Sequence, residues 1–250
     1  MTILEDDLGH PVHLDTPPAR VVSLVPSLTE ALAHSDPALL TAATVWCTHP
    51  AGLDVERVRG TKNPHVSRIV ELTPDLVVAN REENRQRHVE AMREAGIPVW
   101  VTDIRTVPDA FVSVRRLLDV CALPVEGWLP EAERLWSTTP PGGPRVAVPI
   151  WRDPWMFVGA DTFAHDVLAR LGAVNVCAAL EGRYPSACPD DLAPDLAVLP
   201  DEPYAFGPDD GPEAFTSPAA FVSGRDLTWY GPSLVEAHER LTASLAAARP

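Results

Sequence analysis

Short runs of apolar residues alternate along the chain with longer segments in which apolar residues recur every three or four positions. Uninterrupted apolar runs are typical of strands buried on both faces of a parallel sheet, and the wider recurrence is typical of amphipathic helices. Strands that alternate with helices indicate an α/β fold with parallel sheets and right-handed crossovers. The expected strands are residues 21–25, 39–46, 76–79 and 99–101 in the first half, and 146–150, 196–199 and 221–222 in the second.

More local expectations come from the ends of these elements. Ile3–Leu4 and Val12–Leu14 flank Asp6-Asp7-Leu8-Gly9, which predicts a β-hairpin at the N-terminus. Asp161 is expected to cap a helix in the second half. The last helix carries His238 on its apolar side, where we expect a hydrogen-bonded core histidine rather than a ligand.

An internal repeat divides the chain. Residues 71–78 match residues 191–198 in type at almost every position, and in both copies a helix ends before proline and a buried strand begins. Between them, residues 125–144 combine one short helix with a Pro/Gly-rich stop, which favours a connector. We therefore expect a lobe at 1–124 with the N-terminal hairpin and a second lobe at 145–250. Both lobes are expected to be Rossmann-like, with parallel sheets, one connecting helix and a ligand cleft between them.

Charge and composition exclude several classes of partner. The formal net charge is −15, which disfavours nucleic acid and anionic membranes as partners because both need a basic face. No apolar run has the length of a membrane span, so we expect no membrane insertion. The N-terminal residues show no basic leader followed by an apolar stretch, which favours a cytoplasmic location. A periplasmic or extracellular location is the alternative if an export signal has been removed.

Aromatic residues gather in the loops that follow the predicted strands. Ligands of open parallel sheets bind beyond the carboxyl ends of the strands, and these loops hold four of the seven tryptophans. Aromatic side chains at loop tips are not expected to build the core, so they favour a large planar or partly apolar ligand. The candidate ligand-binding residues are Trp46, Lys62, Asn80, Glu83, Arg105, Trp151, Arg152, Trp155, Tyr204, Trp229 and Tyr230.

Three of these loops leave alternatives open. Arg152 could hold a carboxylate or amide of a ligand, or it could pair locally with Asp153 while the neighbouring rings cover the sheet edge. Glu83 and Glu202 occupy equivalent loops of the two halves. They could dock a basic partner, or they could be solvated carboxylates near helix N-termini.

A metal site is a weaker possibility. Cys47 and His49 are two potential ligands one residue apart, but a zinc site needs three or four. The simpler interpretation is a thiol in a reducing compartment and a hydrogen-bonded loop histidine. No P-loop, GxGxxG, HExxH or nucleophile elbow is present, so the sequence favours a non-enzymatic protein. A cytoplasmic metal-handling enzyme that uses Cys47 and His49 remains the alternative.

Several motifs resemble one family. The segments Val21–Glu30 and Arg68–Val78 resemble the first strand and helix and the helix–turn–strand of the class III substrate-binding proteins, also called helical-backbone metal receptors. This family includes the vitamin B12-binding proteins of ABC importers and binders of haem and ferric siderophores. The resemblance covers nearly the whole chain and is greatest to a cobalamin-binding branch, through Gly60–Pro64, Ala79–Arg85, Pro149–Met156 and Trp229–Pro232.

The resemblance implies a receptor with two lobes held by a stiff helix. A cobalamin-like corrinoid would lie between the lobes, with haem or a ferric siderophore as alternatives, and no intrinsic cofactor is implied. The resemblance also implies that glutamates at the lobe tips dock arginines of an ABC permease. By position, that role falls to Glu83 and Glu202.

Overall fold

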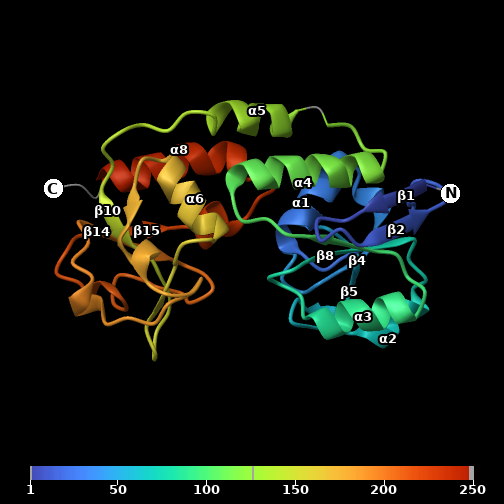
Figure 1. Cartoon of the computed structure of the whole chain (residues 1–250), viewed down its shortest axis with the longest axis horizontal. Coiled ribbons are helices and arrows are strands. Elements are labelled where there is room, and N and C mark those ends of the chain that lie inside the picture. Colours follow the sequence, from blue (N-terminus) through green and yellow to red (C-terminus); the bar gives the residue numbers. More distant parts are fainter. Residues whose placement is uncertain (1, 126, 248–250) are drawn as a thin grey trace. The chain divides into compact units, whose positions relative to one another are not determined.

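The computed structural model describes residues 2–125 and 127–247, and the chain separates into two compact units (Figure 1). Unit 1 runs to Ile104 and adds residues 109–130 and 230–232, and the rest of the chain forms unit 2. This division differs from the predicted boundaries because it falls within the expected connector and returns residues 230–232 to unit 1. Residue 126 of the expected connector and the ends of the two expected lobes, residues 1 and 248–250, lie outside the described residues.

Unit 1 is built on a five-stranded parallel sheet in the order β5-β4-β3-β8-β9. Every residue of β3, β8 and β9 is buried, as their uninterrupted apolar runs predicted. The expected strand at 39–46 is shorter than predicted, because β4 ends at Ala43 and Val45 and Trp46 are exposed. The strands are β3 (Val21–Ser23), β4 (Leu40–Ala43), β5 (Glu56–Arg57), β8 (Leu76–Asn80) and β9 (Val99–Thr102).

Helices cover both faces of this sheet, α1 and α4 on one side and α2 and α3 on the other (Figure 1). Pro26 starts α1 at a position where no backbone donor is needed, and Gly96, with φ +80°, follows the end of α3. Ile69 and Met92 are fully buried against Val77 of the sheet. The elements are α1 (Pro26–Ser35), η1 (Pro37–Leu39), α2 (Val66–Glu71), α3 (Gln86–Glu94), α4 (Val107–Val120) and the small antiparallel pair β6 (Arg59–Gly60) and β7 (Asn63–Pro64).

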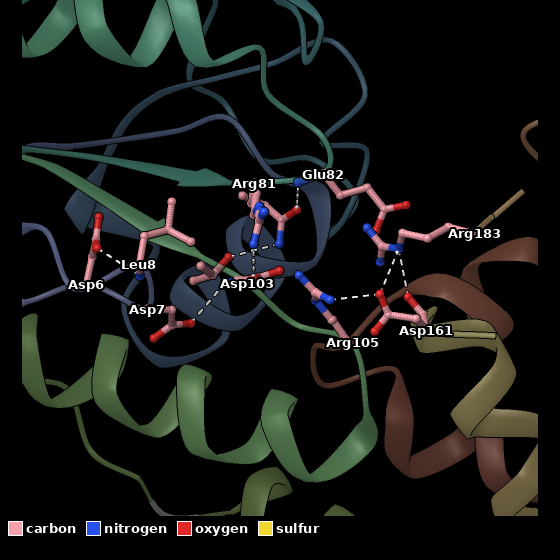
Figure 2. Close-up of polar contacts among 11 residues, drawn as sticks. Asp6, Asp7, Leu8, Arg81, Glu82, Asp103, Arg105, Asp161 and Arg183 are labelled. Carbon is pink, nitrogen blue, oxygen red and sulfur yellow. Dashed lines mark hydrogen bonds and ion pairs between the residues drawn. The ribbon is translucent and has the colours of Figure 1, made fainter.

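The predicted N-terminal hairpin is confirmed as β1 (Thr2–Glu5) paired with β2 (Pro11–Leu14). Its turn is held by Asp6, whose carboxylate accepts hydrogen bonds from the backbone N–H of Leu8 (3.0 Å) and His10 (2.8 Å). The same carboxylate pairs with Arg93 of α3 at 2.8 Å. The Asp7 side chain accepts from the backbone of Asp103, beyond β9 (Figure 2). The hairpin is thereby fastened to the edge of the sheet of unit 1.

Unit 2 has a four-stranded parallel sheet in the order β13-β10-β14-β15. The single strand expected at 146–150 is wrong in detail: β10 ends at Ala147, and the chain then enters an antiparallel pair that carries Trp151. The strands are β10 (Arg145–Ala147), β13 (Val174–Asn175), β14 (Leu196–Pro200), β15 (Ala219–Val222) and the pair β11 (Pro149–Trp151) and β12 (Met156–Phe157).

Two expectations for the helices of unit 2 change. Thr162, not Asp161, caps α6, because the Thr162 hydroxyl accepts from the backbone N–H of His165 at 3.2 Å. His238 is half-buried and packs edge-on against Trp136, whose indole N–H donates to Leu234. The end of α5 is therefore anchored on α8. The helices are α5 (Trp128–Leu135), α6 (Phe163–Arg170), α7 (Gly224–Thr228), α8 (Leu234–Ala247) and the turns η2 (Val176–Ala179), η3 (Pro189–Asp191) and η4 (Pro212–Ala214).

Candidate functional site

In unit 1, the loop after β4 presents Trp46 to solvent. Its side chain is 63% exposed, although a tryptophan of a core would be covered. Gly60 lies beside the ring, since a Cβ at this glycine would come within 3.1 Å of the Trp46 indole nitrogen. Gly60 therefore lies against the edge of the Trp46 ring. The rest of the ring stays open to solvent, where it can contact a ligand.

The loop after β8 is shaped by two asparagines. Asn80 is buried, and its side-chain oxygen accepts from the backbone N–H groups of Glu82 (2.8 Å) and Glu83 (3.2 Å). The Asn84 side chain accepts from the backbone of Asn80 at 2.8 Å and donates to the carbonyl of Thr61 at 2.9 Å. The Asn80 side-chain nitrogen donates to the Thr102 hydroxyl at 3.1 Å, and the expected contact of Asn80 with a ligand stays a prediction. Within the loop, Asn80 positions Glu82 and Glu83.

Glu83 pairs with an aromatic residue from the far end of the chain. The Tyr230 hydroxyl donates to the Glu83 carboxylate at 3.1 Å, and both residues belong to unit 1. Tyr230 is only 5% exposed, and burial raises the pKa of its phenol well above the usual value. The hydroxyl therefore stays protonated and acts as a donor at neutral pH. Lys62 of the same unit donates to the backbone carbonyl of Glu82.

Arg105 does not join the aromatic loops. Within unit 2 it pairs with the Asp161 carboxylate at 2.7 Å, and Arg183 donates to the Asp161 carbonyl at 2.7 Å (Figure 2). Asp161 has φ +58°, a left-handed conformation that Asp tolerates better than most residues. This explains why Asp161 is absent from the cap of α6. The structure gives Arg105 a carboxylate partner, and its expected contact with a ligand stays a prediction.

The aromatic residues of unit 2 divide into an exposed and a packed set. Trp151 is 45% exposed and meets Tyr204 edge-on at 5.7 Å between ring centroids. Trp155 instead stacks on Phe206 at 5.8 Å and packs edge-on against Phe215 at 5.9 Å. The expectation that these loop aromatics stay out of the core is therefore wrong for Trp155, which ties two loops together.

The Arg152 guanidinium group lies over this aromatic cluster, and two carboxylates neutralise its charge. This group lies 5.2 Å from the Trp155 ring centroid, bonds to Asp210 and pairs with Glu213 at 2.6 Å. The local pair with Asp153 that the sequence left open is not the pair formed. Sequence reasoning missed Asp210 and Glu213, since the only signal for them was the excess of acidic residues after β14.

A cavity of about 640 Å³ lies beside these residues in unit 2. Trp155 and Pro154 supply apolar surface, and Glu213 and Asp190 supply carboxylates. The remaining lining residues are Ser186, Ala187, Cys188, Pro189 and Ala214. An apolar wall with a few polar groups is typical of sites for organic ligands of this size.

Trp229 and Glu202 form a second glutamate–aromatic pair, this one within unit 2. The Trp229 indole N–H donates to the Glu202 carboxylate at 3.1 Å. Trp229 is only 8% exposed and lies under the Arg225 guanidinium group, 5.4 Å from its ring centroid, so it is a packed residue rather than an open wall. Burial raises the pKa of the Glu202 carboxyl, and the indole N–H offsets part of that effect.

Cys47 and His49, the suggested metal pair, make separate polar contacts. The Cys47 thiol is buried against the hydroxyls of Thr29 (3.1 Å) and Thr44 (3.2 Å), and burial raises its pKa. The His49 ring instead contacts the Thr48 hydroxyl. Among the described residues, no three His, Cys, Asp or Glu side chains converge as a metal ion would require. A buried, protonated thiol is also a poor nucleophile.

Comparison with curated proteins identifies relatives of one kind. The chain is 28% identical over 173 residues to a vitamin B12-binding protein of Pectobacterium atrosepticum, a match that covers 64% of this chain and 62% of the relative. It is 36% identical over 102 residues to a protein of the same name from Pectobacterium carotovorum, with 40% and 37% covered. The chain thus matches less than two thirds of the length of these relatives. No family model matches it.

Solved structures share the fold at low sequence identity. The periplasmic vitamin B12-binding protein of Vibrio cholerae superposes with a TM-score of 0.74 at 18% identity, over 93% of this chain and 98% of that one. A periplasmic haem-binding protein of Roseiflexus also gives 0.74 at 18% identity, over 92% and 98%. This chain shares the fold of these periplasmic binding proteins. The resemblance drawn from the sequence motifs is confirmed, and so is the α/β fold with parallel sheets.

The comparisons also bear on chemistry and location. These relatives and structural neighbours are named as binding proteins, in agreement with the expectation of a non-enzymatic chain. Both of these solved structures are of proteins described as periplasmic, and neither supports the expected cytoplasmic location. None of the helices described here has both the length and the apolar character needed to cross a bilayer.

Proposed function

We propose that this chain is a non-enzymatic binding protein for a metal-containing chelate, and that its ligand is a cobalamin-like corrinoid. The sequence similarity to vitamin B12-binding proteins carries this proposal, because those matches extend over as much as 190 residues. The exposed rings of Trp46 in unit 1 and Trp151 in unit 2 support it, since flat aromatic groups suit a macrocycle. We propose that strand-end loops with exposed aromatic residues contact the ligand.

Haem is the second candidate. Its support is the fold shared with a periplasmic haem-binding protein that was solved with two haems, at a TM-score of 0.69 and 22% identity. Tyr204 and the exposed Trp151 would offer a haem the same kind of surface as a corrinoid. A ferric siderophore remains a third ligand of the same class, since a solved iron-binding protein of Staphylococcus epidermidis has a TM-score of 0.71.

We further propose that the chain delivers its ligand to an ABC permease and works outside the cytoplasm. Glu83 and Glu202 are the candidate docking residues, one in each unit. Each carboxylate already accepts a bond from a neighbouring aromatic residue, Tyr230 or Trp229. Those bonds hold each carboxylate in one orientation for a partner arginine, although that role has its support only in the family resemblance.

Titration of the purified chain tests the ligand proposal. Cobalamin, cobinamide, haem and ferric siderophores are added in turn, and tryptophan fluorescence and visible absorbance are followed. We expect a corrinoid to quench fluorescence at micromolar concentration or below, because two exposed tryptophans lie in the proposed contact loops. A haem-only response would favour the second candidate, and no response to any of these ligands would count against the proposal.

A further inference from the structure

Arg152 is a cation at the edge of the exposed aromatic surface of unit 2, and it already has two anionic partners. Its Nη1 atom bonds to Asp210 and lies 2.6 Å from a Glu213 oxygen. The same guanidinium group lies over the Trp155 ring, 5.2 Å from the centroid. A guanidinium group with two carboxylate partners has little attraction left for a third.

The two acids are themselves held in place. The Tyr204 hydroxyl donates to Asp210 at 2.6 Å, and the backbone N–H of Gly211 donates to Glu213 at 2.7 Å. The bond from Tyr204 lowers the pKa of Asp210, and the bond from Gly211 lowers the pKa of Glu213. Both carboxylates are therefore ionised at neutral pH, and both are oriented toward Arg152.

The neighbouring cavity has the same electrostatic character. Its lining includes the carboxylates of Glu213 and Asp190 and the apolar surface of Trp155, but no lysine or arginine among the described residues that line it. A ligand group that enters it meets negative charge and aromatic carbon. Like charges placed together across a binding surface repel each other, so an anionic group is disfavoured there.

We propose that Asp210 and Glu213 are specificity-determining residues, because they bind the Arg152 guanidinium group and so keep it from binding the ligand. The site in unit 2 consequently takes a metal chelate whose periphery is neutral or cationic, such as an amide-bearing corrinoid. It discriminates against a chelate whose periphery carries carboxylates, such as a haem or an acidic corrinoid. This inference rests on the proposed function, which leaves the charge of the ligand open.

A matched pair of corrinoids separates charge from shape. Cobinamide carries amides around the corrin ring, and cobyrinic acid carries carboxylates at the same positions. We expect the wild-type chain to bind cobinamide at least about tenfold more tightly than cobyrinic acid, measured by fluorescence titration at low ionic strength. Raising the ionic strength should narrow this gap, because salt screens the repulsion between the acids and the ligand.

The protein side of the test is a double variant, Asp210→Asn with Glu213→Gln. Both amides can still accept the bonds from Tyr204 and Gly211, so the loop keeps its acceptors while Arg152 becomes available. The preference for cobinamide should then fall to within about threefold. Glu236→Gln is the matched control, because it removes an exposed carboxylate of α8 that also pairs with an arginine, and it should leave the preference unchanged.

Each outcome has a definite meaning. Equal binding of the two corrinoids by wild type, or an unchanged preference in the folded double variant, would overturn the inference while leaving the proposed function intact. If neither corrinoid binds and haem binds, the corrinoid proposal fails. Haem and its dimethyl ester then replace the corrinoid pair, and a preference for the ester supports the inference.

If the double variant does not fold, the single variant Glu213→Gln is expected to give an intermediate preference for cobinamide. An unchanged preference in this variant would contradict the inference.

Discussion

At the scale of single residues, the carboxylates of the strand-end loops are matched with aromatic donors. Tyr230 donates to Glu83, Trp229 to Glu202 and Tyr204 to Asp210. A phenol or indole brings one polar hydrogen on a large apolar body, so it can satisfy a carboxylate while it shields that carboxylate from water. These pairs therefore fix the charged groups of the loops without adding positive charge.

The pH dependence of stability should report the Glu202 pair. Burial raises the pKa of Glu202 in the folded protein above the ordinary value of 4.5, so the folded state binds this proton more tightly than the unfolded chain. The contribution of Glu202 to the unfolding free energy therefore falls as the pH rises from about 4.5 to the raised pKa. At higher pH this contribution is constant and unfavourable.

Glu202→Gln should flatten that part of the profile, because glutamine can still accept the Trp229 bond but does not titrate. The variant is expected to be at least as stable as wild type at pH 7. Urea denaturation between pH 4.5 and 7.5 measures this, with Glu236→Gln as the control. A variant whose profile stays parallel to that of wild type would show that Glu202 does not carry the effect.

Thiol reactivity should rank the cysteines by burial. Cys188 is exposed, whereas Cys47, Cys121 and Cys177 are buried. Burial raises the pKa of Cys121 to about 12 and that of Cys177 to about 11, and it also raises the pKa of Cys47. Only the thiolate reacts quickly, so we expect iodoacetamide at pH 7.5 to label Cys188 first.

Mass spectrometry of the labelled, digested protein measures the order of reaction. Labelling in urea is the control, since all four thiols should then react at similar rates. Rapid native labelling of Cys47 would contradict the buried position beside Thr29 and Thr44.

At the scale of elements, the sequence patterns predicted those parts whose signals are local. The strands at 76–79 and 99–101 and the N-terminal hairpin follow from runs and turns in adjacent residues, and the structure has them. The predicted strand at 146–150 was wrong because an apolar run shows burial but not which strand it pairs with. Pairing with β14 ends at Ala147, and Pro149 and Trp151 pair with β12. The helix α7 is too short for a periodic signal and was not anticipated.

The hairpin of unit 1 depends on one buried carboxylate. The Asp6 side chain has no exposed surface, and it serves three backbone donors and the Arg93 guanidinium group. Removing one partner of a buried ion pair leaves the other charge uncompensated, which costs about 3–5 kcal/mol. We expect Asp6→Ala to lower the unfolding free energy of unit 1 by that amount, as measured by urea denaturation.

Two further variants make the Asp6 test specific. Asp6→Asn keeps an acceptor for the N–H groups of Leu8 and His10 but loses the charge, so its cost should be smaller. Glu71→Ala removes the exposed partner of Arg68 and should cost less than about 1 kcal/mol. Equal losses for Asp6→Ala and Glu71→Ala would show that the Asp6 carboxylate does not hold the hairpin.

At the scale of the whole molecule, the candidate site was only partly accessible from sequence. The rule that ligands bind beyond strand ends selected Trp46 and Trp151, and both are exposed. The same rule selected Trp155 and Trp229, whose covering partners, Phe206 and Glu202, come from other loops of the chain. Which aromatic residue of a loop is covered depends on such distant contacts, and these have no signature in the neighbouring sequence.

Trp151 offers the sharpest functional test of the molecule as a whole. Its ring is exposed and meets only the edge of Tyr204 among the aromatic contacts of the described residues, so Trp151→Ala should leave the unfolding free energy nearly unchanged. Aromatic residues that anchor a ligand typically cost more than 1 kcal/mol when truncated, and we expect corrinoid affinity to fall about tenfold or more. Val112→Ala, at an exposed apolar position of α4, is the control and should bind normally. If Trp151→Ala binds the corrinoid with unchanged affinity, the ligand does not contact the end of β11.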